Sequence, residues 1–131
     1  MILVDTGVWI DYFNGVHSQQ TDKLDSSLND DVVAIGDLIL LDILQGFRTD
    51  KEYENARKSL SVLRQFNLLG SDNVTQCAKN YRALRKQGIT IRKTADVIIA
   101  SYCIKHKIPL LFTDRDFQPF VEKLGLVSVS G

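Results

Sequence analysis

The strongest constraint on the fold is an alternation of short apolar runs with segments in which apolar residues recur at helical spacing. Continuous apolar runs of this kind are typical of parallel strands that are covered on both faces. The runs expected to form strands are Met1 to Val4, Val32 to Ile35, Leu110 to Phe112 and, more weakly, Leu126 to Val129. The segments expected to form helices are 8–14, 18–28, 38–44, one capped by Thr49, one capped by Ser71, and 95–105, which Thr94 can cap.

This order of elements predicts an α/β protein. Strand–helix alternation favours right-handed crossovers, and so a three-layer sandwich in which a central parallel sheet of four or five strands is flanked by helices. A length of 131 residues fits a single domain spanning residues 1–131. In such sheets ligands bind beyond the carboxyl ends of the strands, so we expect the chemistry at that edge.

Charge and composition narrow the classes of function. Sixteen basic and sixteen acidic residues give a net charge of zero, so a nucleic acid would be drawn by a local patch or by bound metal. No apolar run approaches the ~20 residues of a membrane helix, and there is no signal-peptide pattern, so we expect a cytoplasmic protein without a membrane partner. The two cysteines, Cys77 and Cys103, lack a metal-binding spacing and are expected to be buried reduced thiols.

Four carboxylates stand next to apolar runs. Asp5 ends the first strand, Asp114 follows the strand at 110–112, and Asp96 precedes an apolar helical stretch. Asp42 lies inside the apolar segment 38–44. A carboxylate beside a buried run is costly without compensation. Any one of them has a structural explanation, such as capping a helix, but four together, with Asp116 two residues after Asp114, indicate a site.

Carboxylates that share a pocket repel one another, and cations relieve that repulsion. A set of ligands made only of oxygen favours Mg²⁺ or Mn²⁺. Zinc is disfavoured because His17 and His106 are isolated and the thiols are elsewhere. Oxygen-ligated Mg²⁺ sites with open positions commonly serve phosphoryl hydrolysis, which makes a nuclease or a phosphatase the expected class.

Four segments, taken in order, resemble the motifs of PIN-domain ribonucleases, specifically the VapC-type toxins of toxin–antitoxin systems. These segments are Val4–Asp11, Leu41–Arg48, Thr94–Ala100 and Leu111–Phe117. The resemblance implies an endoribonuclease that uses Mg²⁺ or Mn²⁺ to hydrolyse RNA phosphodiester bonds. It also implies a homodimer, inhibition by a VapB-like antitoxin, and operator DNA bound only through the antitoxin complex.

The resemblance also assigns residues. It implies the catalytic acids Asp5, Asp42, Asp96 and Asp114, and the metal ligands Asp5, Asp96, Asp114 and Asp116. Thr6 and Thr113 would support the site through hydrogen bonds. Contacts to RNA phosphates are expected from Arg115, Arg48 and Arg92, with Arg85 and Lys93 as further candidates; the alternative for each is a solvated surface charge. Arg115 is the foremost of these because it lies between two site acids.

Position 42 departs from the resembling family, which usually has Glu there. Asp42 is one methylene shorter, and reach matters for a cation that demands near-ideal octahedral geometry. Asp37 is not expected to substitute, because residues five apart on a helix do not share a face well. Two functions therefore stay open: an active nuclease, or a catalytically weakened PIN scaffold that acts mainly by binding its antitoxin and, as a complex, operator DNA.

Other enzyme classes fit less well. Asp5-Thr6-Gly7 matches the triplet of aspartic proteases, but those folds are nearly all β and this chain has many helical periods. The first strand lacks both the acidic pair of a phosphate-accepting receiver domain and the D-x-D of a haloacid-dehalogenase-like phosphatase. No phosphate-binding loop or nucleophile elbow occurs.

Overall fold

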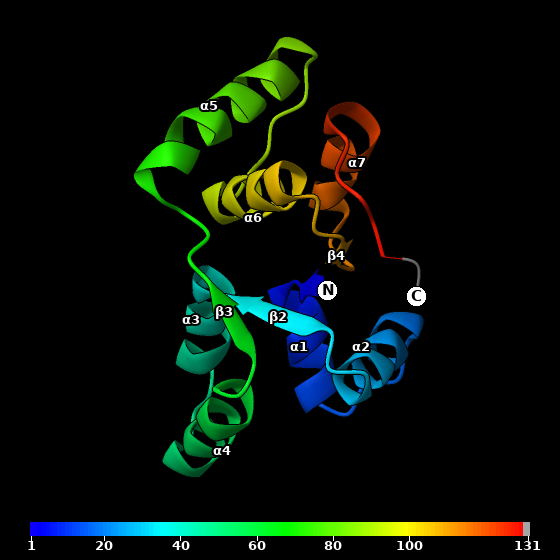
Figure 1. The fold of residues 1–131 in the computed structure, drawn as a ribbon, viewed down its shortest axis with the longest axis vertical. Helices are drawn as coiled ribbons and strands as arrows, with labels where there is room; N and C mark the ends of the chain where they lie inside the picture. The colour runs from blue at the N-terminus through cyan, green and yellow to red at the C-terminus, as the bar shows by residue number, and fades with distance from the viewer. Residues whose placement is uncertain (130–131) are drawn as a thin grey trace.

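A computed structural model describes residues 1–129 and contains a parallel four-stranded sheet flanked by helices (Figure 1). The strands are β1 (Ile2–Val4), β2 (Val33–Gly36), β3 (Arg64–Phe66) and β4 (Leu110–Leu111), in the order β3-β2-β1-β4. The helices are α1 (Thr6–Phe13), α2 (Gln19–Asn29), α3 (Asp37–Gln45), α4 (Asp50–Leu60), α5 (Ser71–Lys86), α6 (Thr94–His106), the 3₁₀ turn η1 (Arg115–Phe117) and α7 (Gln118–Leu124). The predicted α/β sandwich is confirmed.

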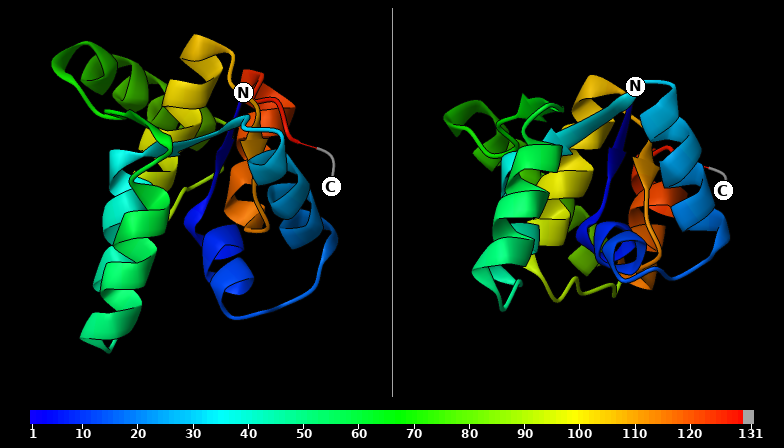
Figure 2. Two further views of the ribbon diagram at one scale, coloured as in Figure 1. Left: turned by 60° about the horizontal axis from the view of Figure 1, so that its bottom comes forward. Right: turned by 90° about the horizontal axis from the view of Figure 1, so that it is seen from below.

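The helices lie in two layers on either side of the sheet. α5, α6 and α7 gather on one side, and α1 to α4 lie on the other (Figures 1 and 2). Leu3 and Val4 of β1 and both residues of β4 are fully buried, which explains why these strands are short continuous apolar runs. β1 lies between β2 and β4, so the end of β1 and the end of β4 are neighbours.

Two strands differ from expectation. β3 was not predicted, because it is an edge strand with the mostly exposed sequence Arg64-Gln65-Phe66 and therefore carries no apolar run. The run from Leu126 to Val129 forms only an isolated parallel bridge between Leu110 and Ser128. Within residues 1–129, the sheet therefore has four strands, at the lower end of the predicted range.

The predicted helix starts are partly correct. Thr49 caps α4 as expected, since its hydroxyl oxygen accepts the backbone N–H of Glu52 at 3.2 Å. Ser71 and Thr94 are instead the first helical residues of α5 and α6, one position after the cap. Gly70 and Lys93 occupy the cap positions, and neither makes a side-chain cap hydrogen bond.

Asp37 joins the start of α3 to the chain that follows β3. Its Oδ1 accepts the backbone N–H of Leu38 at 2.9 Å and that of Leu68 at 3.0 Å. Leu68 is fully buried and packs so closely on Gly36 that a Cβ there would lie 2.3 Å from its Cδ1. Asp37 and Gly36 thus hold this corner of the fold.

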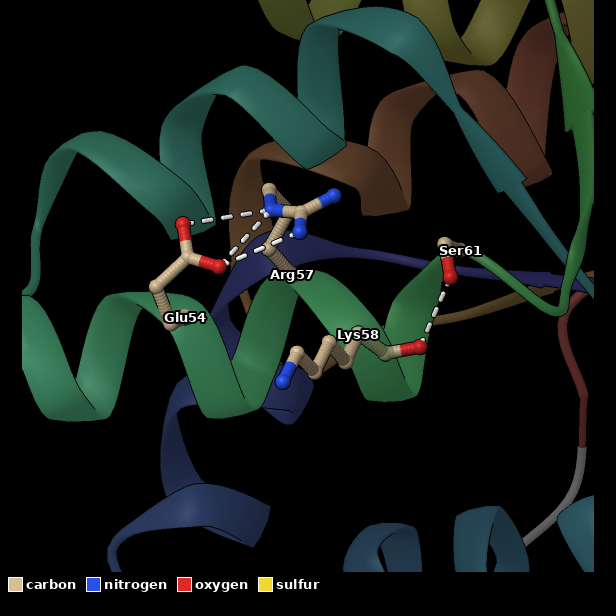
Figure 3. A network of polar contacts seen from close by, with 4 residues as sticks. All are labelled: Glu54, Arg57, Lys58 and Ser61. Atoms are coloured by element: carbon tan, nitrogen blue, oxygen red, sulfur yellow. Dashed lines mark hydrogen bonds and ion pairs between the residues drawn. The ribbon is translucent and has the colours of Figure 1, made fainter.

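On the exposed surface of α4, Glu54 and Arg57 form an ion pair between positions about one helical turn apart (Figure 3). Arg57 donates to Glu54 with an Nη2–Oε2 distance of 3.1 Å, and the Ser61 hydroxyl donates to the Lys58 carbonyl at 2.7 Å. The arginine lowers the pKa of the exposed Glu54 carboxyl. This exposed face offers Lys58 as a control position for charge changes.

Both cysteines are free and buried, as predicted. Burial raises the pKa of the Cys103 thiol to about 12, so the thiol stays protonated. None of the helices in residues 1–129 combines the length and apolar character that crossing a membrane requires.

Candidate active site

Asp5 stands at the carboxyl end of β1. Its backbone N–H donates to the Leu111 carbonyl of β4 at 2.9 Å, which fixes it beside the end of the neighbouring strand. Only 7% of Asp5 is exposed. The pKa of its carboxyl is raised to about 6. Burial is the main cause and the negative charge of Asp114 contributes, while the backbone N–H groups of Thr6 and Gly7 partly offset the shift.

Asp96 lies in the first turn of α6 and is 6% exposed. Within residues 1–129, its Oδ2 has no hydrogen-bond partner. Burial, together with the charges of Asp5 and Asp114, raises the pKa of this carboxyl to about 6. A buried carboxylate oxygen without a donor is costly, so this oxygen indicates a missing positive partner.

Asp114 and Asp116 complete a group of three acids. Both follow β4, and Asp114 Oδ1 accepts the backbone N–H of Asp116 at 2.9 Å, which shapes the turn into η1. Carboxylate oxygens of Asp96, Asp114 and Asp116 lie within 4.8 Å of one another. Three convergent oxygens, one of them on an unsatisfied buried carboxylate, fit a hard divalent cation.

Asp42 lies outside this group. It is exposed on α3, where its Oδ2 accepts the Thr6 hydroxyl at 3.3 Å and its Oδ1 accepts the Gln45 amide at 3.2 Å. Thr6 therefore hydrogen-bonds to Asp42 and connects it to the chain immediately after Asp5. The structure therefore groups Asp96, Asp114 and Asp116, with Asp5 close enough for its charge to act on Asp96, whereas Asp42 lies outside the group.

Gly7 lies close to both the Thr113 hydroxyl and the Asp5 carboxylate. A Cβ on Gly7 would lie 3.4 Å from the Thr113 hydroxyl oxygen and 4.0 Å from Asp5 Oδ2. The Thr113 hydroxyl and the Asp5 carboxylate thus border the same small residue. Sequence reasoning did not single out Gly7, and the signal for it is its position two residues after the first acid.

The predicted RNA-binding arginines fall in different places. Arg92 contacts Asp116, with an Nη2–Oδ2 distance of 3.2 Å. Arg115 is exposed between two site acids and lines a groove of about 700 Å³ together with Thr113. Arg48 lines a separate groove between α1, α3 and α4, and none of the site acids lines that groove. Lys93 also approaches the acids, at 4.0 Å from its Nζ to Asp114 Oδ2.

The profile of the PIN domain family matches residues 2–122, so this chain belongs to the PIN domain family. Over 132 aligned residues, it is 27% identical to a VapC ribonuclease of Mycobacterium bovis and to ribonuclease VapC11 of Mycobacterium tuberculosis. Each alignment covers 99% of this chain and 98% of the relative. These findings confirm the resemblance to VapC-type PIN-domain ribonucleases.

The fold is also shared with a solved structure, VapBC2 from Rickettsia felis bound to a DNA fragment from its promoter. The TM-score is 0.77 at 17% identity, and the match covers 98% of both chains. At that identity the match establishes the fold alone. It agrees with the parallel sheet and helical layers described above.

Proposed function

We propose that this chain is a metal-dependent endoribonuclease that hydrolyses RNA phosphodiester bonds, formed by one PIN domain over residues 1–131 and working in the cytoplasm as the toxin of a toxin–antitoxin pair. One observation carries the proposal. Asp96, a buried carboxylate with one oxygen that has no partner within residues 1–129, converges with Asp114 and Asp116 at the carboxyl edge of a parallel sheet. The whole-length similarity to proteins named VapC ribonucleases supports it.

Asp5, Asp96, Asp114 and Asp116 would hold Mg²⁺ or Mn²⁺. Their oxygen donors suit these ions, and burial, with the charges of the neighbouring acids, raises the pKa values of Asp5 and Asp96, a cost that a bound cation would relieve. When bound, the cation supplies an activated water and neutralises charge on the phosphate. Thr6 and Thr113 would support the site through hydrogen bonds, and Thr6 already donates one to Asp42.

The RNA backbone would be held by Arg115 and Arg92. Both side chains reach solvent next to the acids, where a phosphate must approach. The guanidinium group suits bidentate contacts with phosphate oxygens. Because the chain has no net charge, these local cations and the bound metal are the features that would attract RNA. Arg48 would contact RNA or another partner only outside the acidic centre.

The groove between α1, α3 and α4 suits a VapB-like antitoxin. It is lined by apolar and aromatic side chains, including Ile10, Phe13 and Phe47. Ile10 and Phe13 are 45% and 37% exposed, which is high for such residues on a helix that also contributes to the core. An apolar antitoxin segment would cover them. Operator DNA would then bind through the antitoxin complex, as the promoter-bound VapBC2 structure suggests.

A second groove suits another copy of this chain. It lies between α5 and α6, has a volume of about 520 Å³ and is lined by apolar residues such as Val74, Val97 and Ile98. Val74 is 50% exposed. A homodimer that packs here would bury this apolar surface. Light scattering of the purified chain measures the assembly directly.

The position of Asp42 favours a second candidate function. Its carboxylate hydrogen-bonds to Thr6 and Gln45 instead of joining the acidic group. If that carboxylate is needed for cleavage, the chain would be a catalytically weakened scaffold that works by binding its antitoxin. Glu at this position would lengthen the side chain by one methylene and so give its carboxylate a longer reach.

The test is cleavage of labelled RNA by antitoxin-free protein with Mg²⁺, Mn²⁺ or EDTA. Asp96→Asn and Asp42→Glu are assayed beside the unmodified chain, with Asp72→Asn on the exposed face of α5 as the charge-matched control. We expect metal-dependent cleavage that Asp96→Asn abolishes and Asp72→Asn retains. Cleavage by Asp42→Glu alone would establish the weakened scaffold, and full activity of Asp96→Asn would reject the site.

A further inference from the structure

Two basic residues that are consecutive in the sequence, Arg92 and Lys93, pair with the two acids that follow β4. Arg92 pairs with Asp116 at 3.2 Å, and Lys93 approaches Asp114 at 4.0 Å. The side chains of Arg92 and Lys93 are 78% and 65% exposed, whereas those of Asp116 and Asp114 are 22% and 32% exposed. The cations therefore lie on the solvent side of the carboxylates.

The two cations offset only part of the negative charge at this centre. Asp5, Asp96, Asp114 and Asp116 carry four negative charges when ionised, and Arg92 and Lys93 offset two of them. The remaining charge favours binding of a cation, and a cation held by Asp114 and Asp116 would compete with Arg92 and Lys93 for the same two carboxylates.

The two ion pairs are weak enough to be exchanged. Exposed pairs of this kind contribute about 0–1 kcal/mol, because water screens them and long side chains lose freedom when they are held. A divalent cation interacts with the same carboxylates twice as strongly per unit distance. Once the cation is bound, it neutralises Asp114 and Asp116 and weakens their attraction for Arg92 and Lys93. The N–H donors of these two side chains then become available to an anion that approaches from solvent.

We propose that Arg92 and Lys93 form a cationic latch, meaning a pair that holds Asp116 and Asp114 in the metal-free protein and turns to an RNA phosphate when the cation binds. The inference rests on the proposed function and adds how metal and substrate are coupled. The latch competes with the metal and assists the substrate, so its removal changes the two affinities in opposite directions. A purely structural salt bridge would not produce that pattern.

The size of the effect follows from electrostatics. A unit charge about 6 Å from a divalent ion in water-like surroundings changes its binding by about tenfold, and salt reduces this towards threefold. Lys93→Gln should therefore tighten Mn²⁺ binding by about three- to tenfold and weaken RNA binding by a similar factor. Lys93→Arg keeps the charge and should restore both affinities.

The experiment uses calorimetric titration of Mn²⁺ into the metal-free full chain, and fluorescence anisotropy of a 2′-O-methyl RNA that cannot be cleaved, in Mn²⁺. The variants are Lys93→Gln, Arg92→Gln and the double change, with Lys58→Gln on the outer face of α4 as the matched control (Figure 3). We expect Mn²⁺ binding by the wild-type chain, opposite shifts in the latch variants and no shift in the control.

Several results would overturn the latch. They are unchanged or weaker Mn²⁺ binding in the double variant, or unchanged RNA binding in that variant. Asp96→Asn separates this failure from failure of the proposed function. If the wild type binds Mn²⁺ and Asp96→Asn does not, a negative result rejects the latch alone. If neither binds, or both bind equally, the metal centre itself is rejected.

Discussion

We expect Asp96→Asn to stabilise the metal-free protein while abolishing its metal-dependent activity. The carboxylate is 6% exposed, one of its oxygens has no hydrogen-bond partner within residues 1–129, and three other acids surround it. Asparagine has the same shape, carries no charge and brings an N–H donor for the neighbouring carboxylates. The substitution therefore removes an uncompensated buried charge without leaving a cavity.

The magnitude follows from the pKa of Asp96, which burial and the neighbouring charges raise from 3.8 to about 6. One pKa unit corresponds to about 1.4 kcal/mol, so the charged form costs up to about 3 kcal/mol at neutral pH. Because Asp5 shares the pocket and titrates over the same range, we expect an observed gain of about 1–3 kcal/mol.

The stabilisation by Asp96→Asn should depend on pH in a defined direction. Between about pH 4 and 6, the folded chain keeps a proton on Asp96 that the unfolded chain releases. The wild-type free energy of unfolding therefore falls as the pH rises through this interval, and the whole cost is present above it. The advantage of Asp96→Asn should be largest at pH 7.5 and should nearly vanish at pH 4.

Urea denaturation in EDTA at these two pH values measures the difference, with Asp72→Asn as the exposed control. Mn²⁺ at one hundred times its Kd should then stabilise the wild type by about 2.7 kcal/mol and leave Asp96→Asn unchanged. The reasoning is refuted if Asp96→Asn lowers the free energy of unfolding in EDTA, or if its effect is the same at both pH values.

Three further predictions concern single contacts. Gly36→Ala should lower the free energy of unfolding by about 1–3 kcal/mol in urea, since its Cβ would overlap the buried Leu68 side chain. Ser101→Ala should cost about 1–2 kcal/mol in the same assay, because it removes the 2.8 Å hydrogen bond from the buried Asn80 amide. Asp42→Glu should raise the rate of RNA cleavage by about tenfold, or about 1.4 kcal/mol, and an unchanged rate would show that reach at this position is not limiting.

The class of fold and the edge where the acids gather follow from the order of apolar runs along the chain. Apolar runs mark buried strands wherever both faces are covered, and parallel order brings their carboxyl ends to one side. For this reason Asp5 and Asp114 could be expected to lie close together from their positions after such runs, and the structure places them so. β3 could not be found this way, because an exposed edge strand needs no apolar run.

Which polar groups meet depends on how the helices and strands pack, and the order of residues does not reveal it. The direction of α3 and the hydrogen bonds to Thr6 and Gln45 keep Asp42 out of the acidic group, although it too stands among apolar residues in the sequence. The pairing of Arg92 with Asp116 joins residues far apart in the chain, through the packing of α6 against η1. Local sequence sets which residues form strands and helices, but the distances between charges depend on how those elements pack.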